Sequence, residues 1–393
     1  MSTLELRSVT KRYKKDTVVD NVSFNIADGE TLVLFGPSGA GKTVLLRVIA
    51  GVVELDEGFE EVSSGTISIG GKLVNKLAPV KRNVAMAFEG YSLYPPLTIR
   101  DNIAFALKAT KLNVSEVAKK VTHVSEMLEI DNILDRYPSS VSGGEQQRAS
   151  LARALVRDAD LHLLDEPMGQ LEPQLRALLR GRIKHYIKEK GLTAILVTHD
   201  QAEANALSDR IAVMEGGYLQ QFESPLAIKE RPANLFTGTF IGEPPMNVFN
   251  ANVVQDGNKI LFELDENVVL AYDMNDFSEP VVGAALSSSS VVVGVRPYAV
   301  KRSDAGVDVR VITNQWLGDQ THIAAMLAGQ PLVLVEHDRA LDKIGNNIAV
   351  RLAPESSFCC RATGVAISHG MEWQMMNNHG LIGTSVINLL HLI

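Results

Sequence analysis

The stretch from Thr31 to Thr43 constrains this chain most, because an apolar segment there runs directly into a glycine-rich turn. Residues 31–35 predict a buried strand, and residues 44–49 continue as a helix that ends at Gly51. The turn matches the pattern G-x-x-x-x-G-K-[ST] at every position. Its glycines let the backbone approach an anion, and backbone N–H groups at the helix N-terminus supply partial positive charge. We therefore expect a phosphate site made by Gly36, Pro37, Ser38, Gly39, Ala40, Gly41, Lys42 and Thr43.

Within this loop pattern, the lysine and the hydroxyl residue have separate tasks. Lys42 would reach the β- and γ-phosphates of a nucleotide, and the Thr43 hydroxyl would join the oxygen shell of Mg²⁺. The loop alone predicts nucleotide binding and does not say which class of P-loop enzyme this is.

Composition limits the remaining classes. A chain of 393 residues is too long for one ordinary core, so two or more domains are expected. The net charge of -8 argues against a general nucleic-acid binder, which needs a basic face. The only cysteines, Cys359 and Cys360, are adjacent, which favours a reducing compartment. The N-terminus lacks a signal-peptide core, and no apolar run of about 18 residues occurs. We expect any work at a membrane to be done from its cytoplasmic surface through a partner.

Strands and helices alternate over residues 1–242, which predicts an α/β core with a mostly parallel sheet. Residues 3–30 look like short antiparallel strands, and a helical subdomain is expected over about 90–157. A helix over 115–129 is expected to be capped by Ser115. Further helices are expected over 100–109, from Ser142 to Val156 and from Pro173 to about Lys190, and further strands over 84–88, 161–164 and 194–197.

The composition changes near Glu243-Pro244-Pro245, which we interpret as a domain junction. Helix patterns vanish between about 248 and 365, so residues 243–369 are expected to form a small β-barrel or sandwich. Residues 370–393 are read as a loosely packed tail with an apolar end. The β-strands expected in the second domain are 259–263, 267–271, 290–295, 308–313, 321–326 and 331–335.

A second nucleotide motif follows the apolar strand at 161–164. Asp165 at the strand end would hold Mg²⁺, and Glu166 beside it would polarise the attacking water. A strand that ends in two acids is common and usually structural, but the P-loop upstream favours the functional interpretation.

The stretch from Val141 to Arg148 resembles the signature motif of ATP-binding-cassette (ABC) proteins. Its Ser and two Gly backbones at a helix N-terminus would form a second anion site. The resemblance implies that this site faces ATP held by the P-loop of another ATPase subunit, so that two nucleotides are sandwiched in a dimer. The implied contacts are Ser142, Gly143, Gly144 and Glu145.

The resemblance extends over nearly the whole chain. It implies that Tyr13 stacks on adenine and that His199 contacts the γ-phosphate. The segments around Arg296-Pro297 and Trp316-Leu317-Gly318 resemble the C-terminal OB/TOBE-like β-domain of import ATPases for sugars, polyols and glycerol phosphate. The implied partners are two transmembrane permease subunits, reached through residues 89–102, and indirectly an extracytoplasmic solute-binding protein. The implied location is peripheral, on the cytoplasmic face of the cell membrane.

Three departures from the family pattern leave alternatives open. Glu89 replaces the usual Gln and would add a hard ligand near Mg²⁺ or repel the nucleotide. The loop Gly169-Gln170-Leu171-Glu172 replaces the usual Ser-x-Leu-Asp. The acidic stretch 54–64 is unusually long. The first two departures motivate a hypothesis of pairing with a second, non-identical ATPase subunit. They also motivate a rival class, an ATP-binding interaction subunit with weak hydrolysis.

Two further alternatives concern the class and the cargo. A DNA-repair or chromosome ATPase of the same superfamily is disfavoured, because neither coiled-coil heptads nor a Cys cluster is present. Polyamine and ferric ion remain alternative cargoes to sugars, polyols, glycerol and glycerol phosphate.

Overall fold

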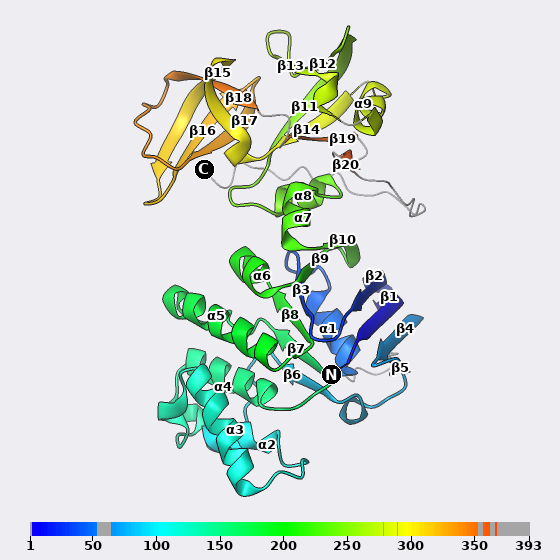
Figure 1. Ribbon diagram of the computed structural model, residues 1–393, viewed down its shortest axis with the longest axis vertical. Helices are drawn as coiled ribbons and strands as arrows, with labels where there is room; N and C mark the ends of the chain where they lie inside the picture. The colour runs from blue at the N-terminus through cyan, green and yellow to red at the C-terminus, as the bar shows by residue number, and fades with distance from the viewer. Residues whose placement is uncertain are drawn as a thin grey trace.

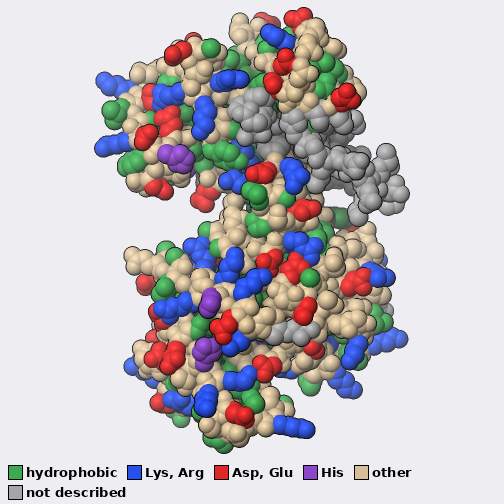
Figure 2. All heavy atoms as spheres, in the orientation of Figure 1, with side chains coloured by type: hydrophobic (Ala, Val, Ile, Leu, Met, Phe, Trp, Pro, Cys, Tyr) green, Lys and Arg blue, Asp and Glu red, His purple; other side chains and the backbone are tan. Residues whose placement is uncertain are grey.

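The structure is a computed structural model that describes residues 2–52, 64–277, 279–288, 290–352, 357–361 and 366–367. Its N-terminal part, with mixed sheets and helices, lies at one end of the molecule, and a β-rich part lies at the other (Figure 1). Between them lie the short helices α7 (Pro225–Glu230) and α8 (Leu235–Phe240). On the face shown in Figure 2, basic and acidic side chains are interspersed, and neither sign forms a continuous patch.

A six-stranded sheet in the order β10-β9-β3-β8-β7-β6 forms the centre of the N-terminal part. Its strands pair in parallel except at the β9–β10 edge. Every residue of β3, β7 and β8 is buried, as expected for parallel strands that are covered on both faces. The strands are β3 (Thr31–Phe35), β6 (Val84–Ala87), β7 (Leu161–Asp165), β8 (Ala194–Thr198), β9 (Arg210–Glu215) and β10 (Tyr218–Glu223).

Alternation along β3 divides the core into two layers. Val33 and Phe35 face a layer built with helices α2 to α8, whereas Leu32 and Leu34 face helix α1 and an antiparallel sheet. That second sheet has the order β2-β1-β4-β5. These elements are β1 (Leu4–Tyr13), β2 (Asp16–Ile26), α1 (Lys42–Ala50), β4 (Ser64–Ile69), β5 (Lys72–Leu73), α2 (Ile99–Phe105), α3 (Val114–Met127), α4 (Gly143–Leu155), α5 (Pro173–Glu189) and α6 (Gln201–Leu207).

The β-rich part packs two antiparallel sheets around one apolar core that runs from Phe249 to Leu352 in sequence. The sheet orders are β13-β12-β11-β14-β19-β20 and β17-β16-β15-β18. The elements are β11 (Asn247–Asp256), β12 (Lys259–Glu263), β13 (Val269–Asp273), α9 (Glu279–Leu286), β14 (Ser290–Val295), β15 (Val300–Trp316), β16 (Thr321–Leu327), β17 (Gln330–Glu336), β18 (Asn347–Leu352), β19 (Ser357–Arg361) and β20 (Ala366–Ile367).

The predicted cap of α3 is wrong. The helix begins after Asn113, whose side chain accepts a hydrogen bond from the Glu116 N–H at 3.0 Å, while the Asn113 N–H donates to Glu116 Oε2 at 2.8 Å. This reciprocal capping box satisfies two end groups at once, so Ser115 lies inside the helix.

The β-rich part also differs from the expectation in one respect. It contains helix α9, which contradicts the expectation that helices are absent between 248 and 365. The predicted division at residue 243 remains a prediction. Residues 54–63 of the acidic stretch and the tail 370–393 lie outside the described residues.

Candidate active site

The glycine-rich turn joins β3 to α1 and packs closely against neighbouring backbone. A Cβ at Gly36 would come within 2.2 Å of the Met214 carbonyl oxygen, and one at Gly41 within 2.4 Å of the Val18 carbonyl oxygen. Gly41 also takes a left-handed conformation, with φ of 89°, as the N-cap of α1 and offers no side-chain acceptor. The first N–H groups of α1 are therefore available to an anion.

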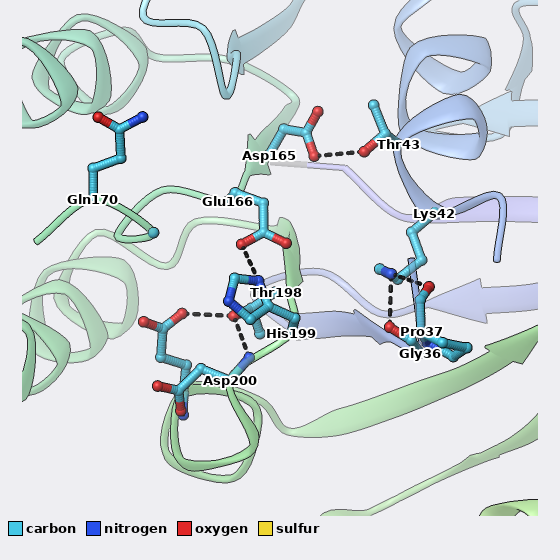
Figure 3. A network of polar contacts seen from close by, with 12 residues as sticks. Gly36, Pro37, Lys42, Thr43, Asp165, Glu166, Gln170, Thr198, His199 and Asp200 are labelled. Atoms are coloured by element: carbon cyan, nitrogen blue, oxygen red, sulfur yellow. Dashed lines mark hydrogen bonds and ion pairs between the residues drawn. The ribbon is translucent and has the colours of Figure 1, made fainter. Parts of the chain in front are cut away.

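Lys42 is almost fully buried beneath this turn. Its Nζ donates to the carbonyl oxygens of Gly36 at 2.7 Å and Pro37 at 2.8 Å (Figure 3). Burial lowers the pKa of Lys42, and the carboxylates of Glu166 and Asp165 partly oppose this shift. The ammonium is thus held at the base of the loop, where a phosphate would lie.

Asp165 ends β7 and faces Thr43 from α1. The Thr43 hydroxyl donates to Asp165 Oδ1 at 2.9 Å (Figure 3). Asp165 is 1% exposed, and its Oδ2 has no hydrogen-bond partner among the described residues. Burial raises the pKa of Asp165, and the charge of Glu89 adds to this shift. A buried carboxylate oxygen without a donor, next to a hydroxyl, fits one side of a Mg²⁺ shell.

Glu166 and His199 meet across the ends of β7 and β8. His199 Nδ1 lies 2.8 Å from Glu166 Oε2 (Figure 3). The side chain of Glu166 is 18% exposed and that of His199 is 67% exposed, so the pair lies at the mouth of the site. A carboxylate beside an imidazole is an arrangement able to accept and retain a proton from water.

A cavity of about 480 Å³ unites most of the expected residues. Residues 38–43 line it together with Glu89, Glu166 and His199, whereas Gly36, Pro37 and Asp165 are not among the lining residues. Gly169 and Gln170 from the altered loop also line it. Among the described residues, no three His, Cys, Asp or Glu side chains gather into a metal cluster. A cation here would therefore need phosphate oxygens in addition to Thr43 and Asp165.

Of the signature stretch from Val141 to Arg148, Gln147 lines this cavity, whereas Ser142, Gly143, Gly144 and Glu145 do not. Ser142 caps α4, where its N–H and hydroxyl donate to Glu145 Oε2 at 2.8 and 3.0 Å. The hydrogen bond from the Ser142 backbone lowers the pKa of Glu145. Gly143 and Gly144 form the first turn of α4 next to the loop at 170–171. The N-terminus of α4, where the second anion site was expected, is therefore separate from the chain's own phosphate loop.

Tyr13 also lies outside the set of residues that line the cavity. It is the last residue of β1, and Lys11 Nζ lies 4.8 Å from the centre of its ring. Its expected stacking on adenine remains a prediction.

The structure reveals two site residues that the sequence reasoning missed. Gln147 of α4 donates to the Glu166 carbonyl oxygen at 2.8 Å and accepts from the Gln170 N–H at 3.0 Å. Arg176 of α5 donates to the Leu171 carbonyl oxygen at 3.1 Å and to Asp200 Oδ2 at 3.0 Å. Gln147 lies within the signature stretch 141–148, but that pattern assigned it no role, and the signal for Arg176 was a polar residue in a helix pattern, which is weak evidence.

A phosphate loop after β3 and an acidic pair after β7 define a P-loop nucleotide-binding protein. A family model described as ABC transporter matches residues 19–169. The trehalose import ATP-binding protein SugC of Mycobacterium tuberculosis is 41% identical over 319 residues, which are 80% of this chain and 78% of SugC. The sn-glycerol-3-phosphate import ATP-binding protein UgpC of Cereibacter sphaeroides is 37% identical over 361 residues, which are 91% of this chain and 96% of UgpC.

A solved structure agrees with these relatives. The dimeric post-hydrolysis structure of the ATP-binding cassette MJ0796 bound to ADP and Pi matches with a TM-score of 0.51 at 26% identity, covering 56% of this chain and 98% of that one. The chain therefore belongs to the ABC transporter ATP-binding proteins and is a transporter ATPase. The expected α/β fold class with a following β-rich part is confirmed. In the described part of the chain, every helix is too short or too polar to cross a membrane.

Proposed function

We propose that this chain is the ATP-hydrolysing subunit of an importer and that the cavity beside Lys42 is its MgATP site. The observation that carries the proposal is the position of the Glu166–His199 pair on the same cavity as the phosphate loop. A base and a phosphate cradle that share one cavity can direct water in line at a terminal phosphate.

Each described side chain would have one task in this reaction. Lys42 and the N–H groups of the turn would hold the β- and γ-phosphates. Thr43 and Asp165 would hold Mg²⁺, which neutralises phosphate charge when bound. Glu166 would accept the proton of the attacking water, and His199 would donate to a phosphoryl oxygen and stabilise the developing charge.

The signature residues would act on the nucleotide of a second ATPase subunit. Ser142, Gly143, Gly144 and Glu145 begin α4 and do not line the chain's own cavity. A dimer would bring this helix N-terminus to the partner's γ-phosphate, as the dimeric state of the related cassette MJ0796 supports. Glu89 and the 169–172 loop depart from the family pattern. These two sites would determine whether this chain pairs with an identical or a non-identical ATPase subunit.

The imported solute would belong to the class of sugars, polyols, glycerol or glycerol phosphate. Relatives named as trehalose and sn-glycerol-3-phosphate import proteins support this class over polyamine or ferric ion. The chain would work on the cytoplasmic face of the membrane with two permease subunits and, indirectly, a solute-binding protein. No nucleic acid is needed for this activity.

The decisive experiment is Mg²⁺-dependent ATP hydrolysis by the purified chain and its Glu166→Gln variant. We expect turnover by the wild type and a loss of at least about 100-fold in the variant, with ATP binding retained, because the amide cannot accept the water proton. A Glu89→Gln variant serves as the comparison, because it restores the amide usual in the family without touching Glu166. Wild-type ATP binding without turnover, even at high concentration, would instead favour the interaction subunit with weak hydrolysis.

A further inference from the structure

Gln147 connects the signature helix α4 to the backbone of Glu166. It is 4% exposed, and both ends of its amide are bound to backbone. Because the Gln170 N–H requires an acceptor, Oε1 faces that residue, and Nε2 must face the Glu166 carbonyl oxygen. The amide orientation is therefore fixed by its two partners.

Glu166 has a backbone conformation that needs such support. Its φ of 47° lies in the left-handed region, which is unfavourable for a residue with a Cβ. Its N–H donates to the Val197 carbonyl oxygen at 3.0 Å, and its carbonyl oxygen accepts from Gln147 and from the Gly169 N–H at 3.3 Å. These bonds fix the direction in which the Glu166 side chain leaves the end of β7.

The loop after Glu166 is held from two sides. Gln147 accepts from the Gln170 N–H on one side, while on the other Arg176 donates to the carbonyl oxygens of Leu171 and, at 3.4 Å, Gly169. The side chain of Gln170 points away from Glu166 (Figure 3). Its Oε1 lies beside Gly143, but the side-chain hydrogen bond from α4 to the Glu166 backbone comes from Gln147.

We propose that Gln147 is a positioning residue for Glu166: it transmits the position of α4 to the backbone that carries the general base. This inference rests on the proposed function, in which the N-terminus of α4 meets the nucleotide of the second subunit. A shift of α4 on dimer closure would move the Gln147 amide, and with it the Glu166 carbonyl. Closure and alignment of the base would then be one event.

The test compares Gln147→Met with wild type in the full-length protein. Met keeps the length of the side chain and removes both hydrogen bonds. We expect kcat for ATP hydrolysis to fall about tenfold, equivalent to about 1.4 kcal/mol of transition-state stabilisation, with KM for ATP changed less than about twofold. Hydrogen exchange of residues 166–171 should become faster.

Tyr186→Phe provides the matched control. The Tyr186 hydroxyl is buried and donates to the Leu155 carbonyl oxygen, at the far end of the same helix, at 3.3 Å. Removing this hydroxyl also removes a hydrogen bond from a buried side chain to the backbone, but this bond lies outside the cavity. We expect kcat and exchange at 166–171 to stay at the wild-type values in this variant.

Two results would overturn the proposal: wild-type kcat in Gln147→Met, or a raised KM with unchanged kcat, which would assign Gln147 to nucleotide binding. If Gln147→Met does not fold, Gln147→Glu keeps the acceptor for the Gln170 N–H and loses only the donor to Glu166, and the same two outcomes apply. Full turnover by Glu166→Gln would refute the proposed base. Hydrogen exchange at 166–171 in the Gln147 variants would then still decide whether Gln147 holds this backbone.

Discussion

Arg296 joins the β-rich part to the helices that end the N-terminal part, and its replacement offers a quantitative test. The residue follows β14 and is 1% exposed. Its guanidinium donates to the carbonyl oxygens of Lys229 at 2.9 Å, Gly238 at 2.8 Å and Ile241. These acceptors lie at the C-terminal ends of α7 and α8, where helix dipoles favour a cation. Burial nevertheless lowers the pKa of Arg296 to about 10.

The cost of Arg296→Met follows from these contacts. Three carbonyl groups lose a charged donor, at about 1.5 kcal/mol each, and relief of the buried charge offsets only part of the loss. We expect the free energy of unfolding to fall by about 3 kcal/mol. In a unit of about 150–250 residues this corresponds to a decrease in Tm of about 6–12 °C. Differential scanning calorimetry measures this decrease in Tm. The two parts have separate cores, and Arg296 connects them, so its loss removes contacts that stabilise both.

Arg302→Met is the matched control for this experiment. Arg302 binds Glu336 and Asp342, but its side chain is 38% exposed, so solvent screens these ion pairs. We expect a loss of less than about 1 kcal/mol from this substitution. Equal and small changes in Tm for both variants would refute the reasoning. The exposed ion pairs of Arg302 would then contribute as much free energy of unfolding as the buried hydrogen bonds of Arg296 to the ends of α7 and α8.

Two further predictions concern a helix cap and a buried charge. Asn113→Ala should lower the free energy of unfolding in urea by about 1 kcal/mol, whereas Ser115→Ala should change it by less than about 0.5 kcal/mol; the reverse order would restore Ser115 as the cap. Asp165→Asn should raise the Tm of the nucleotide-free protein by about 2 °C or more, because it removes a buried charge, and should abolish the stabilisation by MgATP. Thermal shift assays with and without MgATP measure both effects, and a lower Tm without nucleotide would contradict the first.

Local chemistry explains which parts of the fold could be predicted. The strand–turn–helix around Gly36 and the strand that ends at Asp165 follow from buried apolar runs next to glycine or acids. The cap of α3 was also predictable, since Asn113 and Glu116 have the spacing of a capping box and Ser115 lacks an acid three residues later. The prediction of Ser115 did not use this spacing.

Long-range contacts explain the parts that could not be predicted. Gln147 binds the Glu166 carbonyl oxygen 19 residues away in sequence, and Arg176 binds Asp200 24 residues away. Helix α9 is short and mostly apolar. Its sequence therefore lacks the alternation of polar and apolar faces that would distinguish a helix from a strand. In both cases the deciding contacts arise from tertiary structure.

The same topology explains why the chain holds only part of the proposed catalytic arrangement. Gly36 and His199 follow β3 and β8, Asp165 is the last residue of β7, and the carboxyl ends of parallel strands meet at one edge of a sheet. These three motifs therefore converge although they are far apart in sequence. Ser142 follows no strand of this sheet and caps the N-terminus of α4; although α4 packs against β6 and β7, Ser142 does not line the cavity at this edge. If Ser142 contacts a phosphate, we expect that phosphate to belong to a second subunit, and Gln147 would link α4 to the backbone of this chain's own base.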